Sequence, residues 1–146
     1  MPIFPEANTI FIDVPRSGTV AVREWFMRHS SCVGEPHQLP EAYAGIDMPS
    51  VIVARNVYDR VASACAKWWH VPGFFDKWLD GKIPFSASMV KFIGDLDPEI
   101  VPFENLADRF PGIMHLNRSD PIPLTDEQRI RVAKTYADEI EMFGWE

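Results

Sequence analysis

Thr9-Ile-Phe-Ile-Asp-Val-Pro-Arg-Ser-Gly-Thr19 is the stretch that decides the predicted fold. Its apolar run from Ile10 to Val14 is typical of a parallel strand that is covered on both faces. A helix is predicted directly after the turn, because one set of side chains recurs at helical spacing: Val22, Trp25, Phe26 and His29. The turn Pro15–Thr19 therefore presents the free N–H groups and the positive end of a helix, which together favour binding of an anion.

The turn differs from the Walker loop of nucleotide-binding proteins. The Walker pattern requires Gly, four residues, Gly-Lys and then Ser or Thr, whereas Pro15-Arg-Ser-Gly-Thr19 is shorter and contains no lysine. Taken alone, the turn has two equally good interpretations. It is either an anion site or an ordinary helix start in which Ser17 and Thr19 act as capping residues.

Length and composition are those of one ordinary globular domain, and we expect residues 1–146 to form a single minimal domain. No run approaches the roughly 20 apolar residues that a membrane span needs, and the N-terminus lacks the pattern of a signal peptide. We therefore expect a cytoplasmic protein without a membrane partner. The oligomeric state is not predicted.

The distribution of charge indicates where an anionic ligand binds. The net charge of −7 argues against a nucleic-acid partner. From Asp95 to the end of the chain there are twelve acidic and five basic residues, but between Arg16 and Lys67 there are six basic and five acidic ones. An anion is therefore expected in the first half. Cys32 and Cys65 lack metal-ligand spacing and are predicted to be free thiols.

A second strand and helix repeat the arrangement of the first pair. Val51–Ala54 is a β-branched apolar run, and a helix is predicted from about Val57 to His70. A strand, a helix and another strand predict a right-handed parallel crossover, in which ligands bind beyond the carboxyl ends of the strands. The fold class is therefore α/β, with a small central parallel sheet between helices in three layers. A third strand is predicted at Glu99–Phe103 and a C-terminal helix from Thr125 to about Phe143.

The second strand and its helix carry a resemblance to a known family. Val51-Ile-Val-Ala-Arg55-Asn-Val-Tyr58-Asp59-Arg60-Val-Ala-Ser63 resembles the Val-Arg-Asn-Pro-Tyr/Trp-Asp-Arg-x-x-Ser signature of sulfotransferases that use PAPS (3′-phosphoadenosine 5′-phosphosulfate). The turn Pro15–Thr19 resembles the phosphosulfate loop of the same family. Three further segments resemble the carbohydrate and bacterial branch, in the same order along the chain: Gly34-Glu-Pro-His37, Phe103-Glu-Asn-Leu106 and His115-Leu-Asn117-Arg-Ser119. The resemblance implies a P-loop-like fold.

The resemblance also implies roles for particular residues. The phosphosulfate is held by the turn and the helix start, namely Pro15, Arg16, Ser17, Gly18, Thr19 and Val20. Arg55 and Ser63 hold the 3′-phosphate, and Asn117 and Ser119 contact the 3′ side or form a turn. Arg16 balances charge on the leaving phosphate. His37 is the general base that accepts the acceptor proton, with Glu35 and Glu41 as alternatives.

The expected function is transfer of the sulfuryl group from PAPS to a hydroxyl or amine of a small-molecule or carbohydrate acceptor, without a metal. Three positions depart from the family pattern, since Arg16 replaces lysine, Val20 replaces Thr or Ser, and Val57 replaces proline. Two other functions remain open: an ATP-dependent phosphotransferase or NTPase, for which Asp13 is the one candidate Mg²⁺ ligand, and a non-catalytic relative that binds PAP or PAPS. The acceptor is not predicted.

Overall fold

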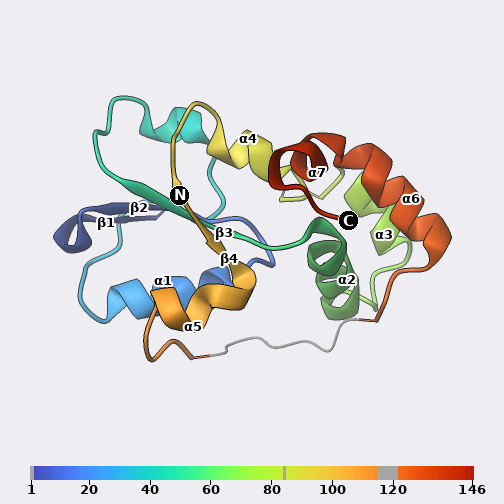
Figure 1. Cartoon of the computed structure of the whole chain (residues 1–146), viewed down its shortest axis with the longest axis horizontal. Helices are drawn as coiled ribbons and strands as arrows, with labels where there is room; N and C mark the ends of the chain where they lie inside the picture. Colours follow the sequence, from blue (N-terminus) through green and yellow to red (C-terminus); the bar gives the residue numbers. More distant parts are fainter. Residues whose placement is uncertain (1, 84, 115–121) are drawn as a thin grey trace.

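The computed structural model describes residues 2–83, 85–114 and 122–146. Four strands form one sheet in the order β1 (Ile3–Phe4), β2 (Thr9–Ile12), β3 (Ser50–Ala54) and β4 (Glu99–Pro102) (Figure 1). The chain is therefore an α/β protein, as predicted, but the sheet is mixed rather than parallel. β1 runs antiparallel to β2 because only the short 3-10 helix η1 (Pro5–Ala7) and Asn8 connect them. Such a short connection can join only antiparallel neighbours.

The parallel part of the sheet brings two strand ends to one edge. β2 and β3 pair in parallel with Ile12 opposite Ile52, and β3 pairs in parallel with β4. In this register the turn after β2 and the residues after β3 leave the same edge of the sheet. The sequence predicted this arrangement from the two apolar runs and the long connection between them.

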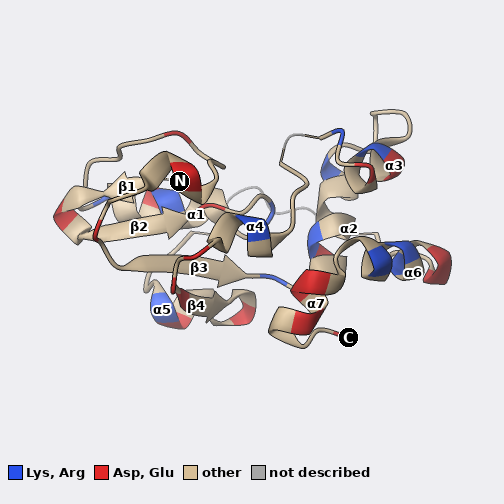
Figure 2. Cartoon of the chain, turned by 90° about the horizontal axis from the view of Figure 1, so that it is seen from above, with Lys and Arg blue, Asp and Glu red and all other residues tan. Residues whose placement is uncertain are grey.

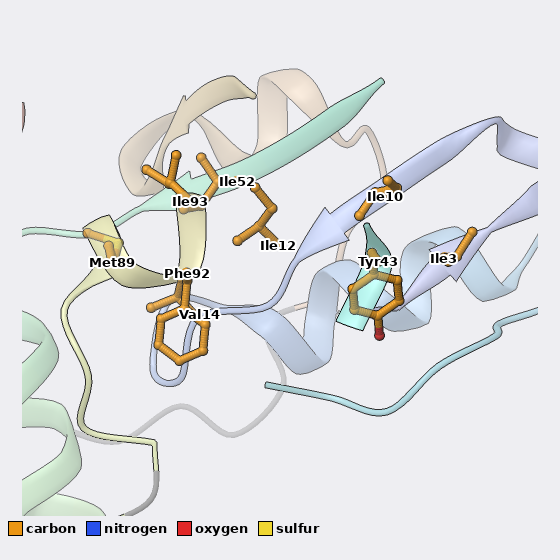
Figure 3. Packing of buried hydrophobic residues seen from close by; sticks show 9 residues of the cluster. All are labelled: Ile3, Ile10, Ile12, Val14, Tyr43, Ile52, Met89, Phe92 and Ile93. Carbon is orange, nitrogen blue, oxygen red and sulfur yellow. The ribbon is translucent and has the colours of Figure 1, made fainter. Parts of the chain in front are cut away.

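Helices cover both faces of the sheet. Ile10, Ile12 and Ile52 face α4 (Met89–Ile93) and the 3-10 helix η2 (Pro40–Tyr43), and Figure 3 shows the residues of this layer meeting one another. Phe11, Val51 and Val53 face the opposite way. They pack against α1 (Thr19–Met27), α5 (Leu106–Arg109) and the 3-10 helix η3 (Phe103–Asn105). The alternation of side chains along each strand therefore gives the three predicted layers.

Four helices form a second body of packed side chains beyond the carboxyl end of β3 (Figures 1 and 2). They are α2 (Val57–Lys67), α3 (Phe74–Leu79), α6 (Asp126–Thr135) and α7 (Ala137–Phe143). We call this group the helical cluster. Its fully buried side chains include Val57, Val61, Trp78 and Val132. The buried residues of α2 include Arg60 and Ser63 as well as the apolar Val57, Val61 and Ala64, and the helix packs on other helices rather than on the sheet.

The helices are shorter than the sequence predicted. The C-terminal helix is interrupted at Tyr136, whose hydroxyl donates a hydrogen bond of 2.5 Å to the carbonyl oxygen of Ser86. On the segment before the interruption Val132 is buried, whereas Ile130 is 70% exposed. The longest helix of the described ranges has 11 residues, and none is long and apolar enough to cross a membrane.

Candidate functional site

The turn between β2 and α1 requires glycine at position 18. Gly18 precedes the first helical residue Thr19 and has a φ of 75°, in the left-handed region that favours glycine. A Cβ atom at this position would lie 3.1 Å from Cδ1 of Leu106 and 3.3 Å from the ring of Phe103. The segment Phe103–Leu106 therefore presses against the turn and fixes its shape.

Ser17 is buried in the turn with a hydroxyl that has no hydrogen-bond partner among the described residues. No side chain caps α1, so the interpretation of Ser17 and Thr19 as capping residues is wrong. The N–H groups of Gly18, Thr19 and Val20 donate no backbone hydrogen bond within the described part of the chain. A buried hydroxyl left unpaired costs about 1–3 kcal/mol. The turn thus contains a hydroxyl and several N–H groups that suit the oxygen atoms of an anion.

The two predicted loops lie side by side. Arg16 adopts a φ of 66°, and its Nε and Nη2 donate hydrogen bonds of 3.1 and 2.7 Å to Oγ of Ser63 on α2. Arg55, which follows β3, donates from Nη1 to the carbonyl oxygen of Arg16 at 2.9 Å. A left-handed conformation is uncommon for arginine, and such strained residues cluster at functional sites.

Two guanidinium groups share this half-buried region. Burial and the neighbouring charge of Arg55 both lower the pKa of Arg16 from its usual value. Burial also lowers the pKa of Arg55, whereas the charges of Asp59 and Glu104 act in the opposite direction. The Arg55 guanidinium lies 4.4 Å from the centre of the Phe103 ring, which orients it without cancelling its charge. Because arginine stays protonated in proteins, the region carries two partly desolvated positive charges.

Aromatic side chains form one wall beside the arginines. The guanidinium of Arg16 lies 5.9 Å from the centre of the Trp68 ring, and Trp68 lies 5.7 Å from Phe85. The ring of Phe85 is in turn 6.0 Å from that of His37. This row of contacts links the predicted base to the turn. Two other tryptophans lie away from this wall, since Trp78 is fully buried in the helical cluster and Trp69 is 78% exposed.

His37 is held by Asp13. Its Nδ1 atom lies 3.1 Å from the carbonyl oxygen of Asp13 and 3.2 Å from the Oδ1 atom of the same residue. His37 has a φ of 60°, so it is strained like Arg16. Burial alone lowers the pKa of His37, but the hydrogen bond and the charge of Asp13 outweigh it, and the pKa is raised above 6.5. The alternative bases Glu35 and Glu41 are both exposed.

Two groups of predicted residues fall outside this arrangement. Asn117 and Ser119 lie outside the described residues. Arg60, which belongs to the signature-like segment Arg55–Ser63, is fully buried in the helical cluster, where its Nη2 contacts Oε1 of Glu139 at 2.5 Å. The sequence did not single out Glu139. The sequence grouped Arg60 with Ser63 and Lys67 on a face apart from the apolar one, so neither its burial nor its acidic partner was predicted.

No group of three His, Cys, Asp or Glu side chains suited to a metal ion occurs among the described residues. Asp13, the candidate Mg²⁺ ligand, is fully buried between His37 and Arg23, whose Nε lies 3.6 Å from its Oδ2. Cys32 is exposed and Cys65 is half-buried, and both are free thiols, as predicted. The site therefore consists of cationic, hydroxyl and backbone groups, which suit an anionic ligand rather than a cation.

Comparisons with known proteins add no assignment to this site. A scan against models of protein families and searches of curated proteins and of solved structures found no match. The chemistry of the site is therefore argued from its own residues. It combines a turn with unpaired hydrogen-bond donors that suit an anion, a second arginine and a serine after the neighbouring strand, and an imidazole with a buried carboxylate behind it.

Proposed function

We propose that this protein is a sulfotransferase with a P-loop-like fold that uses PAPS and transfers its sulfuryl group to a hydroxyl or amine acceptor. The family resemblance of the turn Pro15–Thr19 and of the segment from Arg55 to Ser63 gives the proposal its cofactor. The observation that carries it is the contact of these two segments through Arg16, Ser63 and Arg55. PAPS has two phosphate positions, and this arrangement offers one group of donors for each.

The unpaired hydroxyl of Ser17 supports the proposal that the turn Pro15–Thr19 binds the 5′ phosphosulfate. It lies buried in a turn whose helix start supplies N–H groups, and Arg16, the preceding residue, adds a positive charge that reaches Ser63 on α2. Charge that develops on a leaving phosphate is stabilised by donors that are already in place. Arg55 and Ser63 supply the donors for the 3′-phosphate, since a guanidinium matches the geometry of phosphate oxygens. Asn117 and Ser119 stay predicted contacts of the 3′ side.

Transfer needs the acceptor oxygen or nitrogen to lose a proton as it attacks sulfur. The new bond to sulfur forms while the bond from sulfur to the 5′-phosphate breaks, and the bonding electrons leave with the phosphate oxygen. His37 accepts the proton, because a neutral imidazole is a base near neutral pH. Arg16 and the N–H groups of the turn stabilise the charge on the leaving group.

The proposal is tested by ligand binding. Unfolding temperatures are measured with PAP (3′-phosphoadenosine 5′-phosphate), with ADP, which lacks the 3′-phosphate, and with ATP and Mg²⁺. At 100 times its dissociation constant a ligand stabilises a protein by about 2.7 kcal/mol. We expect this effect from PAP and a much smaller one from ADP. Equal stabilisation by both nucleotides, or stabilisation by ATP and Mg²⁺ alone, would contradict the proposal and favour a phosphotransferase or NTPase.

A second experiment separates transfer from binding. His37→Ala should lower turnover by about 10²- to 10⁴-fold, the usual contribution of a general base, while PAP affinity is nearly unchanged. Arg131→Ala is the control, because this arginine forms an exposed ion pair with Asp76 in the helical cluster. Tight PAP binding by the wild-type protein without transfer to any hydroxyl or amine acceptor would favour the non-catalytic alternative.

A further inference from the structure

Asp13 is a buried acid that the family resemblance leaves without a role. Its side chain is 0% exposed, and the residue directly follows β2, two positions before the turn Pro15–Thr19. Acidic side chains are almost never fully buried unless they are paired with a charged or donor group. The groups that face Asp13 are the imidazole of His37, at 3.2 Å, and the guanidinium of Arg23 on α1, at 3.6 Å.

The geometry fixes which nitrogen of His37 carries the proton. Nδ1 is hydrogen-bonded to the carbonyl oxygen of Asp13 at 3.1 Å, and the carboxylate Oδ1 of the same residue lies 3.2 Å away in an ion-pair contact without hydrogen-bond geometry. Neither oxygen donates a hydrogen, so Nδ1 must be the donor in both the neutral and the charged imidazole. In the neutral form Nε2 therefore carries the lone pair. This nitrogen is the only one in the ring that can accept a proton.

We propose that Asp13 is the positioning residue for His37, holding the proton on Nδ1 so that Nε2 acts as the base for sulfuryl transfer. The inference rests on the proposed function for its reaction, but the pairing itself is independent of that function. During transfer the acceptor proton moves to Nε2, while the Nδ1 proton stays hydrogen-bonded to Asp13. The imidazolium that forms is balanced by the carboxylate. It returns its proton to solvent after the product and PAP leave.

The charges around His37 act in opposite directions. Asp13 favours the protonated imidazole, Arg23 disfavours it, and burial disfavours it as well. Among the described residues these two are the charged groups that act on His37. Asp13 faces it from the end of β2 and Arg23 faces it from α1. Two substitutions should therefore move the His37 pKa in opposite directions, which a general loss of packing would not do.

The direct test is a titration of His37 by NMR in the full chain, without nucleotide. In the wild-type protein the neutral ring should carry its hydrogen on Nδ1. Asp13→Asn, which preserves the shape of the side chain, should lower the His37 pKa and keep this tautomer, because the Asp13 carbonyl still accepts from Nδ1. Arg23→Gln should raise the pKa, and it serves as the second variant if Asp13→Asn does not fold. A neutral ring protonated on Nε2, or a pKa unchanged in a folded variant, would overturn the inference.

The same variants are then compared in sulfuryl transfer. Asp13→Asn should lower kcat by roughly 10- to 100-fold with little change in KM for PAPS, because it weakens the base and not the binding site. The acidic limb of its pH profile should move to lower pH. A protein that neither binds PAP nor transfers sulfuryl would refute the proposed function while the NMR result still stood. A protein that transfers normally after Asp13→Asn, with an unmoved acidic limb, would refute the positioning role alone.

Discussion

Arginine is used in two different ways in the two halves of the molecule. In the helical cluster Arg60 and its partner Glu139 are both 0% exposed and form a close ion pair. At the carboxyl edge of the sheet Arg16 and Arg55 are only half-buried, and Arg55 is oriented by a carbonyl oxygen and by the face of Phe103. The first pair is electrically neutral. The second region keeps a positive charge where the chain turns, which is what binding of an anion requires.

The comparison indicates how to separate structural from ligand-binding arginines in this chain. Glu139 contacts Arg60 on α2, and its Oε1 also accepts a hydrogen bond from the N–H of Met89, at the start of α4. It therefore joins three helices. Burial raises the pKa of Glu139, while Arg60 and the Met89 N–H act against that rise. Removal of Arg60 or Glu139 should therefore lower the stability of the fold, whereas removal of the Arg55 side chain should lower ligand affinity.

The largest effect is expected for Glu139→Ala. This substitution leaves the buried guanidinium of Arg60 without a carboxylate, and breaking a buried pair in this way costs about 3–5 kcal/mol. Urea unfolding measures the loss. The double variant Arg60→Met with Glu139→Leu should recover most of the stability, because an apolar pair removes both buried charges. A loss below about 1 kcal/mol in Glu139→Ala would mean that the pair is not a structural support.

Smaller effects are expected at the turn Pro15–Thr19, where one substitution should raise stability and lower ligand affinity. Ser17→Ala should raise the stability of the free protein by about 1 kcal/mol, since it removes an unpaired buried hydroxyl. It should also weaken PAP binding by about 3- to 10-fold, because one hydrogen bond to the ligand is lost. Thermal unfolding and calorimetric titration measure the two quantities.

Ser86→Ala is the matched control for this variant. Ser86 is also buried, but its hydroxyl donates to the carbonyl oxygen of Ile83 at 2.9 Å. Its loss should therefore destabilise the protein by about 1 kcal/mol and leave PAP affinity unchanged. If both serine variants changed stability in the same direction, the hydroxyl of Ser17 would have a partner and the interpretation of the turn would be wrong.

The smallest effect concerns pH. Because the pKa of His37 is raised above 6.5 in the folded state, protonation of this ring stabilises the fold. The contribution is complete below pH 6.5 and is lost as the pH rises through the folded pKa. The difference in unfolding free energy between the wild type and His37→Asn should therefore shrink as the pH rises above 6.5. A difference that grows with pH would mean that folding lowers the pKa of His37 instead of raising it.

The sequence predicted the part of the fold that positions the site. The apolar runs of β2 and β3, with a long connection between them, were enough to predict parallel neighbours whose carboxyl ends meet. The predicted proximity of the two segments after these strands is confirmed by the contact of Arg16 with Ser63, although that contact itself was not predicted. These predictions succeeded because they depend on periodicity and connection length, which are properties of the chain itself.

Contacts set by irregular segments were not predictable. β1 has two residues, which is too short for any alternation to be read. The pairing of Asp13 with His37 depends on the backbone of the irregular segment after α1, in which His37 itself has a φ of 60°. The sequence around His37 contains no signal for this left-handed conformation. Likewise, Glu139 follows a helix interruption at Tyr136 that changed which face of the C-terminal segment is buried. In each case the tertiary structure, and not local preference, decided the partner.

The central claim is that the site recognises a nucleotide with a separate 3′-phosphate, and one calorimetric comparison tests it most directly. Dissociation constants for PAP and ADP are measured in the wild type and in Arg55→Ala. Because a charge-assisted hydrogen bond contributes about 1.5–3 kcal/mol, we expect Arg55→Ala to weaken PAP about 10- to 100-fold and ADP very little. The preference of the wild type for PAP should therefore disappear in the variant. An equal loss of affinity for both nucleotides, or no preference in the wild type, would contradict the account.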